Sequence, residues 1–407
     1  MKKSFILFLV FVLFSFQLPV QSCTTAIISG KATIDGRPLI LKHRDADALQ
    51  NRLVFFTDGK YKYIGLVNSH DTANAEVWAG FNETGFGIMN SASYNLRLKD
   101  TSKLKDLEGV IMKKALQVCA SLEDFEKLLT ELPKPLGVEA NFGVVDAHGG
   151  VAYYEVDNYK FIKFDANDPV TAPNGYIIRT NYSFAGEENQ GAGYIRYQTA
   201  SKVFTDKYEE GKFSFDFLLN DIPRCLTHSF TNENLLEKMP DNSEDTRYVY
   251  FRDYIPRYFS SAAVVIQGVV PGESPKLATM WTILGFPLSS VAVPVWITDE
   301  GKLPQILQGN EKGIAPLCDL ALKLKDNMFS TQKDARENYI NLAAVANKDK
   351  TGILQKLAPI EEEVLNKAKN QISAWRENGF DNTGAVDFYN WIDGNLLKEI
   401  KTRFKME

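Results

Sequence analysis

The order of the strand-like runs is the feature of this sequence that most limits its fold. Short runs rich in branched and aromatic residues follow one another with turn residues between them. They are found at 53–57, 61–67, 76–80, 87–89, 142–146, 151–156, 176–180, 262–269 and 291–297. Parallel sheets need helical crossovers between strands, whereas consecutive hairpins build antiparallel sheets. The sequence therefore predicts an α+β fold of antiparallel sheets with helices on their faces.

Helical patterns lie in two parts of the chain. Helical periodicity is found over residues 104–120, 122–132, 360–378 and 385–403. The second of these begins after Ser121, an N-cap residue, with Glu123 and Asp124 in its first turn. Strand signals stop at about residue 316. We expect residues 316–407 to form helices that pack on a catalytic core of residues 23–315, with a separate helical domain as the alternative.

The composition excludes some classes of protein. Hydrophobic residues make up 44% of the 407 residues and the formal net charge is −5, which is typical of a globular chain and argues against disorder. There are 46 Lys and Arg against 51 Asp and Glu, so the basic excess of a nucleic-acid-binding protein is missing. A chain of this length buries a large core without disulfide bonds.

The first 22 residues depart from this average composition. Two lysines precede an apolar run over residues 5–14, and Pro19 and Ser22 follow it. This order of basic, apolar and small residues is typical of a secretory signal peptide, and the run is shorter than the ~20 residues that span a bilayer. We expect cleavage after Ser22 and export to the periplasm or the medium, so that Cys23 becomes the first residue. An uncleaved anchor helix is the alternative.

Cys23 has a second interpretation. Bacterial lipoprotein signals also cleave before a cysteine, which then carries lipid on its sulfur, although Gln21 is not the small residue that such signals prefer. A thioether cannot be a nucleophile, whereas a free N-terminal cysteine carries a thiol and a base in one residue. Residues 24–30 continue as a strand and not as a polar tether. This favours the nucleophile, and a lipid-anchored binding protein remains the alternative.

An N-terminal cysteine nucleophile needs no histidine, because its own α-amine, with a pKa of about 8, can accept the thiol proton. The chain has four histidines, none of them in a zinc-binding spacing. His148 is the best partner for a Cys–His pair, but the surrounding Asp146-Ala147-His148-Gly149-Gly150 reads more simply as a hairpin turn.

Polar residues at the ends of strand-like runs are candidates to assist Cys23. Arg44 and Asp47 close the run that follows the turn at Asp35-Gly36, and could return to the cysteine. Asn90 and Asn181 each follow a later run. An amide in such a place can stabilise an oxyanion, or it can simply form a turn.

Together these pieces resemble the N-terminal-nucleophile hydrolases, specifically the choloylglycine hydrolase, penicillin V acylase and acyl-coenzyme A:6-aminopenicillanic acid acyltransferase groups. The motifs are, in order, Cys23-Thr24-Thr25, Asp35-Gly36, Arg44-x-x-Asp47, Asn82-Glu83-x-Gly85 followed by Asn90, and Arg179-Thr180-Asn181. The resemblance covers about residues 23–300. It departs from the usual Arg-Asn-x-Asp pattern at Asp45, and the interval from Cys23 to Arg44 is longer than usual.

The resemblance implies an αββα sandwich and cleavage of linear amide bonds other than ordinary peptide bonds, in a small N-acyl substrate. It implies that Cys23 is the nucleophile, that Arg44 and Asp47 tune the thiol and hold the α-amine, and that Asn90 and Asn181 serve the oxyanion and the amine. An acyltransferase that uses the same thioester is an alternative. The sequence leaves the oligomeric state open, with a homo-oligomer as one option.

Further residues remain open at this stage. A second arginine usually follows the last asparagine motif, and Arg257 is a candidate, whereas Arg196 reads as a structural helix position. Cys119, Cys225 and Cys318 are either free buried thiols or include one disulfide pair. The sequence holds no Walker loop, no GxGxxG and no metal-ligand motif, so we expect no cofactor and no metal.

Overall fold

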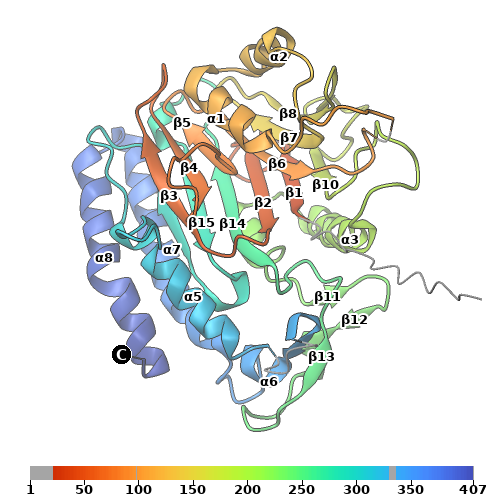
Figure 1. Ribbon diagram of the computed structural model, residues 1–407. Helices are drawn as coiled ribbons and strands as arrows, with labels where there is room; N and C mark the ends of the chain where they lie inside the picture. The colour runs from red at the N-terminus through yellow and green to blue at the C-terminus, as the bar shows by residue number, and fades with distance from the viewer. Residues whose placement is uncertain (1–21, 98, 330–335, 407) are drawn as a thin grey trace, which may run out of the picture.

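The computed structural model describes residues 22–97, 99–329 and 336–406, and two antiparallel sheets form its centre (Figure 1). The predicted leader, apart from Ser22, lies outside the described residues. The first sheet has the strand order β10 (Tyr176–Arg179), β1 (Thr24–Ile28), β2 (Leu39–Asp45), β14 (Ser260–Gln267), β15 (Thr279–Leu284) and β16 (Ala292–Val295).

The second sheet follows the chain order, as a series of hairpins does. Its strands are β3 (Asn51–Phe56), β4 (Tyr63–Asn68), β5 (Ala79–Asn82), β6 (Gly87–Ala92), β7 (Ala140–Val145), β8 (Val151–Val156) and β9 (Phe161–Asp165). β1 and β2 of the first sheet contact β6 and β7 of the second, so the two sheets stack face to face.

Helices cover both outer faces. On the second sheet lie α1 (Glu108–Val118), which contacts β5 and β6, and α2 (Leu122–Glu131), which contacts α1. On the first sheet lie α3 (Tyr194–Glu210) against β10 and β1, α4 (Phe215–Asn220) against β14, and α7 (Ile353–Asn378) against β16. The layers therefore run helix, sheet, sheet, helix, which confirms the predicted αββα arrangement.

The hairpin that opens the chain forms as predicted from its turn residues. β1 and β2 pair antiparallel, and every residue of both strands is buried. Gly36 has φ +75° in the connection, a left-handed conformation that glycine adopts without strain. Burial of both strands on both faces explains why the sequence over 26–28 and 39–41 is continuously apolar.

Element boundaries differ from the prediction in a few places. β5 begins at Ala79 and not at residue 76, because the preceding Val77 instead donates its N–H to Gly109 in α1. α1 begins at Glu108 and not at residue 104, because Asp106 has φ +63°, which no α-helix accommodates. β9 and β15 were not among the predicted elements, and α3 was indicated only by the helix position predicted for Arg196.

Among the described residues from 316 onward, helices and one short strand are the regular elements. It holds α5 (Pro316–Asp326), α6 (Leu342–Val345), α7 and α8 (Asn382–Phe404). The prediction that strands end at residue 316 is wrong for β17 (Tyr339–Asn341), which pairs with β13 (Tyr248–Tyr250). Another small ribbon joins β11 (Thr227–His228) and β12 (Glu233–Asn234).

The C-terminal helices pack directly on the first sheet. Trp296, just beyond β16, has its ring against Trp375 of α7 and against Phe388 and Tyr389 of α8. The Tyr389 hydroxyl also accepts a hydrogen bond from the Trp296 backbone N–H at 2.6 Å. Among the helices that the structure describes, none is both long and apolar enough to cross a membrane.

Candidate active site

The strand register determines which side chains accompany Cys23. Cys23 directly precedes β1 and is 6% exposed. Thr25 is the partner of Lys42 in β2, so continuing the pairing by two residues places Cys23 opposite Arg44. Directly opposed residues in antiparallel strands project to the same face. Cys23, Lys42 and Arg44 therefore share one face of the first sheet.

That face is the inner one. The Thr25 hydroxyl, on the same face, accepts a hydrogen bond from the Tyr153 hydroxyl of β8 at 2.8 Å. β8 belongs to the second sheet. The cysteine thus stands at the end of a strand, between the two sheets and away from the outer helices.

Arg44 presents a buried positive charge held by neutral groups. Its Nη1 donates to Asn51 Oδ1 at 2.9 Å and Ser261 Oγ at 3.1 Å, and its Nη2 donates to Asn68 Oδ1 at 2.9 Å. The guanidinium also lies 5.1 Å from the centre of the Trp78 ring. Burial lowers the pKa of Arg44 to about 10, while a negative charge on Cys23 acts in the opposite direction. Arg44 therefore keeps its positive charge at neutral pH on the face that carries Cys23.

Lys42 is a second buried cation on this face, and the sequence analysis did not single it out. Its Nζ donates to Asn90 Oδ1 at 2.5 Å and to the carbonyl of Trp78 at 2.7 Å. Burial lowers the pKa of Lys42 to about 7, again opposed by the charge of Cys23. The spacing of two residues from Arg44 in a strand was the signal that could have identified Lys42.

The backbone of Cys23 is held by Arg196, from α3. Arg196 Nη1 donates to the Cys23 carbonyl at 2.6 Å and to Thr24 Oγ1 at 2.9 Å. Its Nη2 donates to Asn181 Oδ1 at 2.8 Å, and Asn181 Nδ2 donates to the carbonyl of Ala92 at 2.9 Å. Arg196 is in a helix, as predicted, but it also links Asn181 to the cysteine.

Arg257 approaches from the start of β14 to the peptide bond before Cys23. Its Nη2 donates to the carbonyl of Ser22 at 3.0 Å, and its Nε donates to Asp45 Oδ2 at 2.8 Å. Asp45 also accepts from the Ser260 hydroxyl at 2.6 Å and lies 3.2 Å from His43 Nε2. Burial alone would raise the pKa of Asp45, but Arg257 and His43 hold it well below its usual range.

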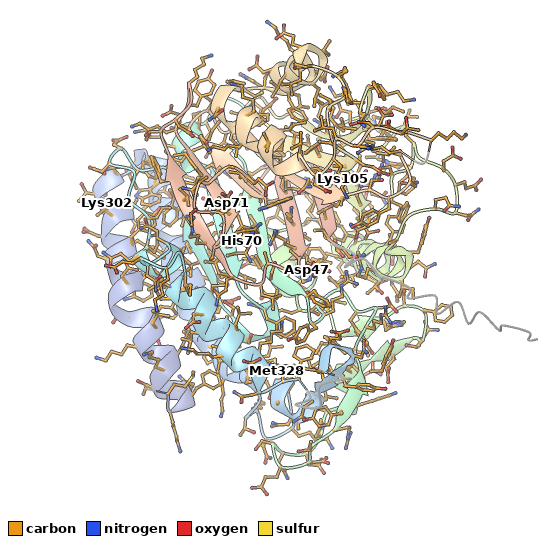
Figure 2. The ribbon with its side chains drawn as sticks, in the orientation of Figure 1. Asp47, His70, Asp71, Lys105, Lys302 and Met328 are labelled. Atoms are coloured by element: carbon orange, nitrogen blue, oxygen red, sulfur yellow. The ribbon has the colours of Figure 1, made fainter. Side chains whose placement is uncertain are left out.

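Asp47 lies apart from this cluster. Its side chain is exposed on the segment after β2 (Figure 2), and among the described residues it makes no hydrogen bond or ion pair. The buried carboxylate is that of Asp45, the last residue of β2. A bulge in β14 lets Ser260 face Asp45 while Ser261 reaches Arg44, which the sequence did not reveal.

His148, the candidate partner for a Cys–His pair, lies outside the cluster. His148 lies in the turn between β7 and β8, where its backbone N–H donates to Asp146 Oδ1 at 2.9 Å, as the turn interpretation predicts.

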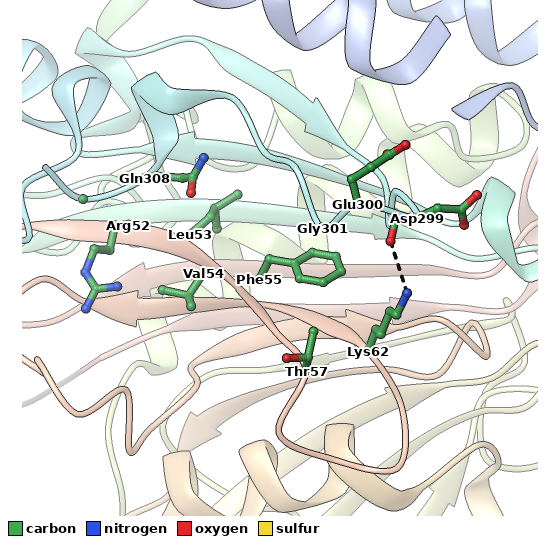
Figure 3. A pocket seen from close by; sticks show the side chains of 11 residues that line it. Arg52, Leu53, Val54, Phe55, Thr57, Lys62, Asp299, Glu300, Gly301 and Gln308 are labelled. Atoms are coloured by element: carbon green, nitrogen blue, oxygen red, sulfur yellow. Dashed lines mark hydrogen bonds between the residues drawn. The ribbon is translucent and has the colours of Figure 1, made fainter. Parts of the chain in front are cut away.

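A surface hollow lies between β3 and residues 299–309 (Figure 3). A hydrogen bond of 3.2 Å from Lys62 Nζ to the Asp299 carbonyl crosses it. Within the described ranges, no group of His, Cys, Asp and Glu side chains could hold a metal ion.

The four cysteines differ in their surroundings, although all are free and buried. Burial raises the pKa of Cys119 and Cys318 to about 12 and raises that of Cys225. At pH 8 a thiol with such a pKa is ionised to the extent of about one part in ten thousand.

We therefore expect iodoacetamide at pH 8 to modify Cys23 first, because burial suppresses the thiolates of Cys119, Cys225 and Cys318. Peptide mass spectrometry over a time course would measure the four rates. Labelling of Cys119 or Cys318 as fast as Cys23 would contradict this expectation.

No family model and no curated protein matches this chain. Among solved structures, it is similar to an N-acylethanolamine-hydrolyzing acid amidase ortholog of Caenorhabditis elegans, with TM-score 0.40 and 14% identity over 61% of this chain and 94% of the other. It is also similar to a mutant of a Clostridium perfringens conjugated bile acid hydrolase, with TM-score 0.41 and 11% identity over 68% of this chain and 92% of the other. The penicillin V acylase of Agrobacterium tumefaciens is a third similar structure, with TM-score 0.36 and 12% identity over 68% of this chain and 87% of the other.

Proposed function

We propose that this chain is an exported hydrolase that cleaves the amide bond of a small N-acyl compound through a thioester on Cys23. The observation that carries the proposal is the placement of Cys23. It directly precedes an inner strand, buried, with the cations of Arg44 and Lys42 on its face and Arg196 on its carbonyl. Cleavage after Ser22 would complete the site by exposing the α-amine.

The reaction begins with the thiol. The free α-amine of Cys23, with a pKa of about 8, takes the thiol proton, directly or through water. The thiolate attacks the amide carbon, and the C=O electrons move onto oxygen. Arg44 lowers the cost of the negative charge, because it acts in a buried site where water screens little.

Collapse of the intermediate releases the amine product. The C–N bond breaks, and the leaving nitrogen takes the proton from the α-ammonium, which leaves a thioester on Cys23 Sγ. Water, deprotonated by the α-amine, then attacks the thioester and frees the acid and the thiol. The Asn90 side chain, which comes from β6 of the second sheet and accepts a hydrogen bond from Lys42, is the proposed oxyanion donor.

We assign the holding of the N-terminus to Asp45, Arg257 and Arg196. Arg257 donates hydrogen bonds to both the Ser22 carbonyl and the Asp45 carboxylate. Its guanidinium therefore links this carboxylate to the peptide bond that would be cleaved. The family pattern would give this role to Asp47, which is exposed here. The burial of Cys23 also disfavours the lipoprotein alternative, because a lipid on its sulfur would have to fit between packed sheets.

A substrate panel tests the proposal. We expect the mature protein to release free acid from at least one of penicillin V, a conjugated bile salt, an acyl homoserine lactone and an N-acyl amino acid. Intact-mass analysis should show an unmodified N-terminal Cys23 before reaction and an acyl adduct on it during turnover. Added hydroxylamine separates the alternatives, because an acyltransferase would form mainly the hydroxamate. A diacylglycerol adduct on Cys23 would reject the nucleophile.

A further inference from the structure

The contact between Lys42 and Asn90 decides which end of the Asn90 amide faces the reaction. Lys42 Nζ lies 2.5 Å from the amide of Asn90. An ammonium group can only donate hydrogen bonds, so the atom that it holds must be Oδ1. The NH2 group of Asn90 then points away from Lys42 and is left for other acceptors.

We infer that Lys42 is a positioning residue that fixes Asn90 as the oxyanion donor of this enzyme. The inference rests on the proposed function and goes beyond it, because none of the sequence motifs includes Lys42. Turning the Asn90 amide over would set its NH2 group against the ammonium, two donors facing each other in a buried site. Lys42 thereby favours the one orientation in which Asn90 can donate to a developing negative charge.

Lys42 is itself held firmly enough to do this. Its side chain is 1% exposed, and a second hydrogen bond of 2.7 Å ties Nζ to the carbonyl of Trp78. Nζ also lies 5.8 Å from the centre of the Trp78 ring. Lys42 belongs to β2 in the first sheet and Asn90 to β6 in the second, so their bond also fixes the spacing of the two sheets beside Cys23.

The charge of Lys42 changes near neutral pH, which gives the inference a distinctive readout. The titratable groups that act on Lys42 are Cys23 from the start of β1, Arg44 from β2 and Glu108 from α1. With a pKa of about 7, Lys42 carries its charge below pH 7 and loses it above. The contribution of Lys42 to oxyanion stabilisation by Asn90 should therefore be greatest at acidic pH and should decline as the pH rises.

The test compares Lys42→Met, Asn90→Ala and the double variant, each in the mature protein. We expect each single variant to lower kcat by about a hundredfold with KM almost unchanged, as loss of an oxyanion donor does. The double variant should be no slower than Asn90→Ala, because Lys42 acts through Asn90. The ratio of wild-type to Lys42→Met kcat should be larger at pH 6 than at pH 9.

Lys325→Met is the matched control. Lys325 is also a buried lysine with a pKa lowered by burial to about 7, and it donates to the carbonyl of Tyr258, the residue after Arg257. We expect its kcat to stay within about twofold of the wild type. A similar loss in both variants would indicate general destabilisation and overturn a specific role for Lys42.

Two results would overturn the inference even if amide hydrolysis is confirmed. One is a Lys42→Met variant with wild-type kcat; the other is a double variant whose losses multiply to about ten thousandfold. Crystal structures of the wild type and Lys42→Met test it independently of turnover. An Asn90 amide that keeps its orientation without Lys42 would overturn it. If no substrate is cleaved, the proposed function fails, and the two crystal structures still decide whether Lys42 orients Asn90.

Discussion

Replacing Cys23 with alanine is expected to reduce amide hydrolysis by at least about a thousandfold, because the covalent step has no other nucleophile to use. The substitution removes one sulfur from a site between two sheets that hold their own hydrogen-bond ladders. We therefore expect the thermal midpoint of the variant to stay close to that of the wild type. Rates should be measured on the best substrate of the panel, with circular dichroism to check the fold.

The matched control is Cys225→Ala, because Cys225 is buried to almost the same extent, with 7% exposure against 6% for Cys23. It should retain wild-type activity. A protein that keeps Ser22 in front of Cys23 should be as inactive as Cys23→Ala, because its cysteine nitrogen is an amide and not a base. Full activity with Ser22 retained would contradict the α-amine mechanism and leave the thiol with another base.

The sequence predicted the parts of this molecule that local pattern determines. The hairpin order of the runs, with an Asp-Gly turn after the first, indicated antiparallel sheets, and two such sheets stack in the structure. Cys23 was predicted to be the nucleophile from its position after the expected leader and at the start of a strand. Neither inference requires knowledge of which strands become neighbours.

The roles of the two arginines that the sequence left open depend on long-range pairing. Arg196 bonds the carbonyl of Cys23, which is 173 positions away, and Arg257 bonds Asp45 across 212 positions. No period or spacing within one segment reports such contacts. Arg196 comes from α3 and Arg257 from the segment before β14. The places of these two segments are set only when the first sheet forms.

The choice between Asp45 and Asp47 shows the same limit at short range. Both carboxylates are odd-numbered positions of one segment, so alternation alone gives them the same face. The strand ends at Asp45, however, and the bulge opposite it in β14 brings Ser260 to its carboxylate. Where a strand ends is set by its partner strands, and that information is absent from the four residues of the motif.

The second large effect is expected for Asp45→Asn, which should lower the free energy of unfolding at pH 7 by about 3 kcal/mol or more. The Asp45 carboxylate is fully buried and bonds Arg257 and Ser260, with His43 3.2 Å away. An amide of the same shape cannot balance the guanidinium of Arg257. Urea denaturation of both proteins at pH 7, 5 and 3 measures the difference.

The pH series tests the cause of that loss. The pKa of Asp45 is lower in the folded chain than its ordinary value of 3.8, so its carboxylate stabilises the fold fully above the pKa of the unfolded chain. That contribution is lost as the pH falls through the folded-state pKa. The stability gap between wild type and Asp45→Asn should thus be constant from pH 7 to 5 and shrink at pH 3. A gap that is equally large at pH 3 would contradict the electrostatic explanation.

Asp47→Asn is the control that the chain provides two residues away. Asp47 is exposed, and in the described part of the chain its side chain has no hydrogen-bond or ion-pair partner, so the change should alter stability by less than about 0.5 kcal/mol at every pH. Activity then separates the two carboxylates. If Asp45 holds the N-terminal amine, Asp45→Asn loses kcat and Asp47→Asn does not. If Asp47→Asn abolishes hydrolysis while its stability is unchanged, the amine is held by Asp47, and the segment after β2 must fold back toward Cys23 in the mature enzyme.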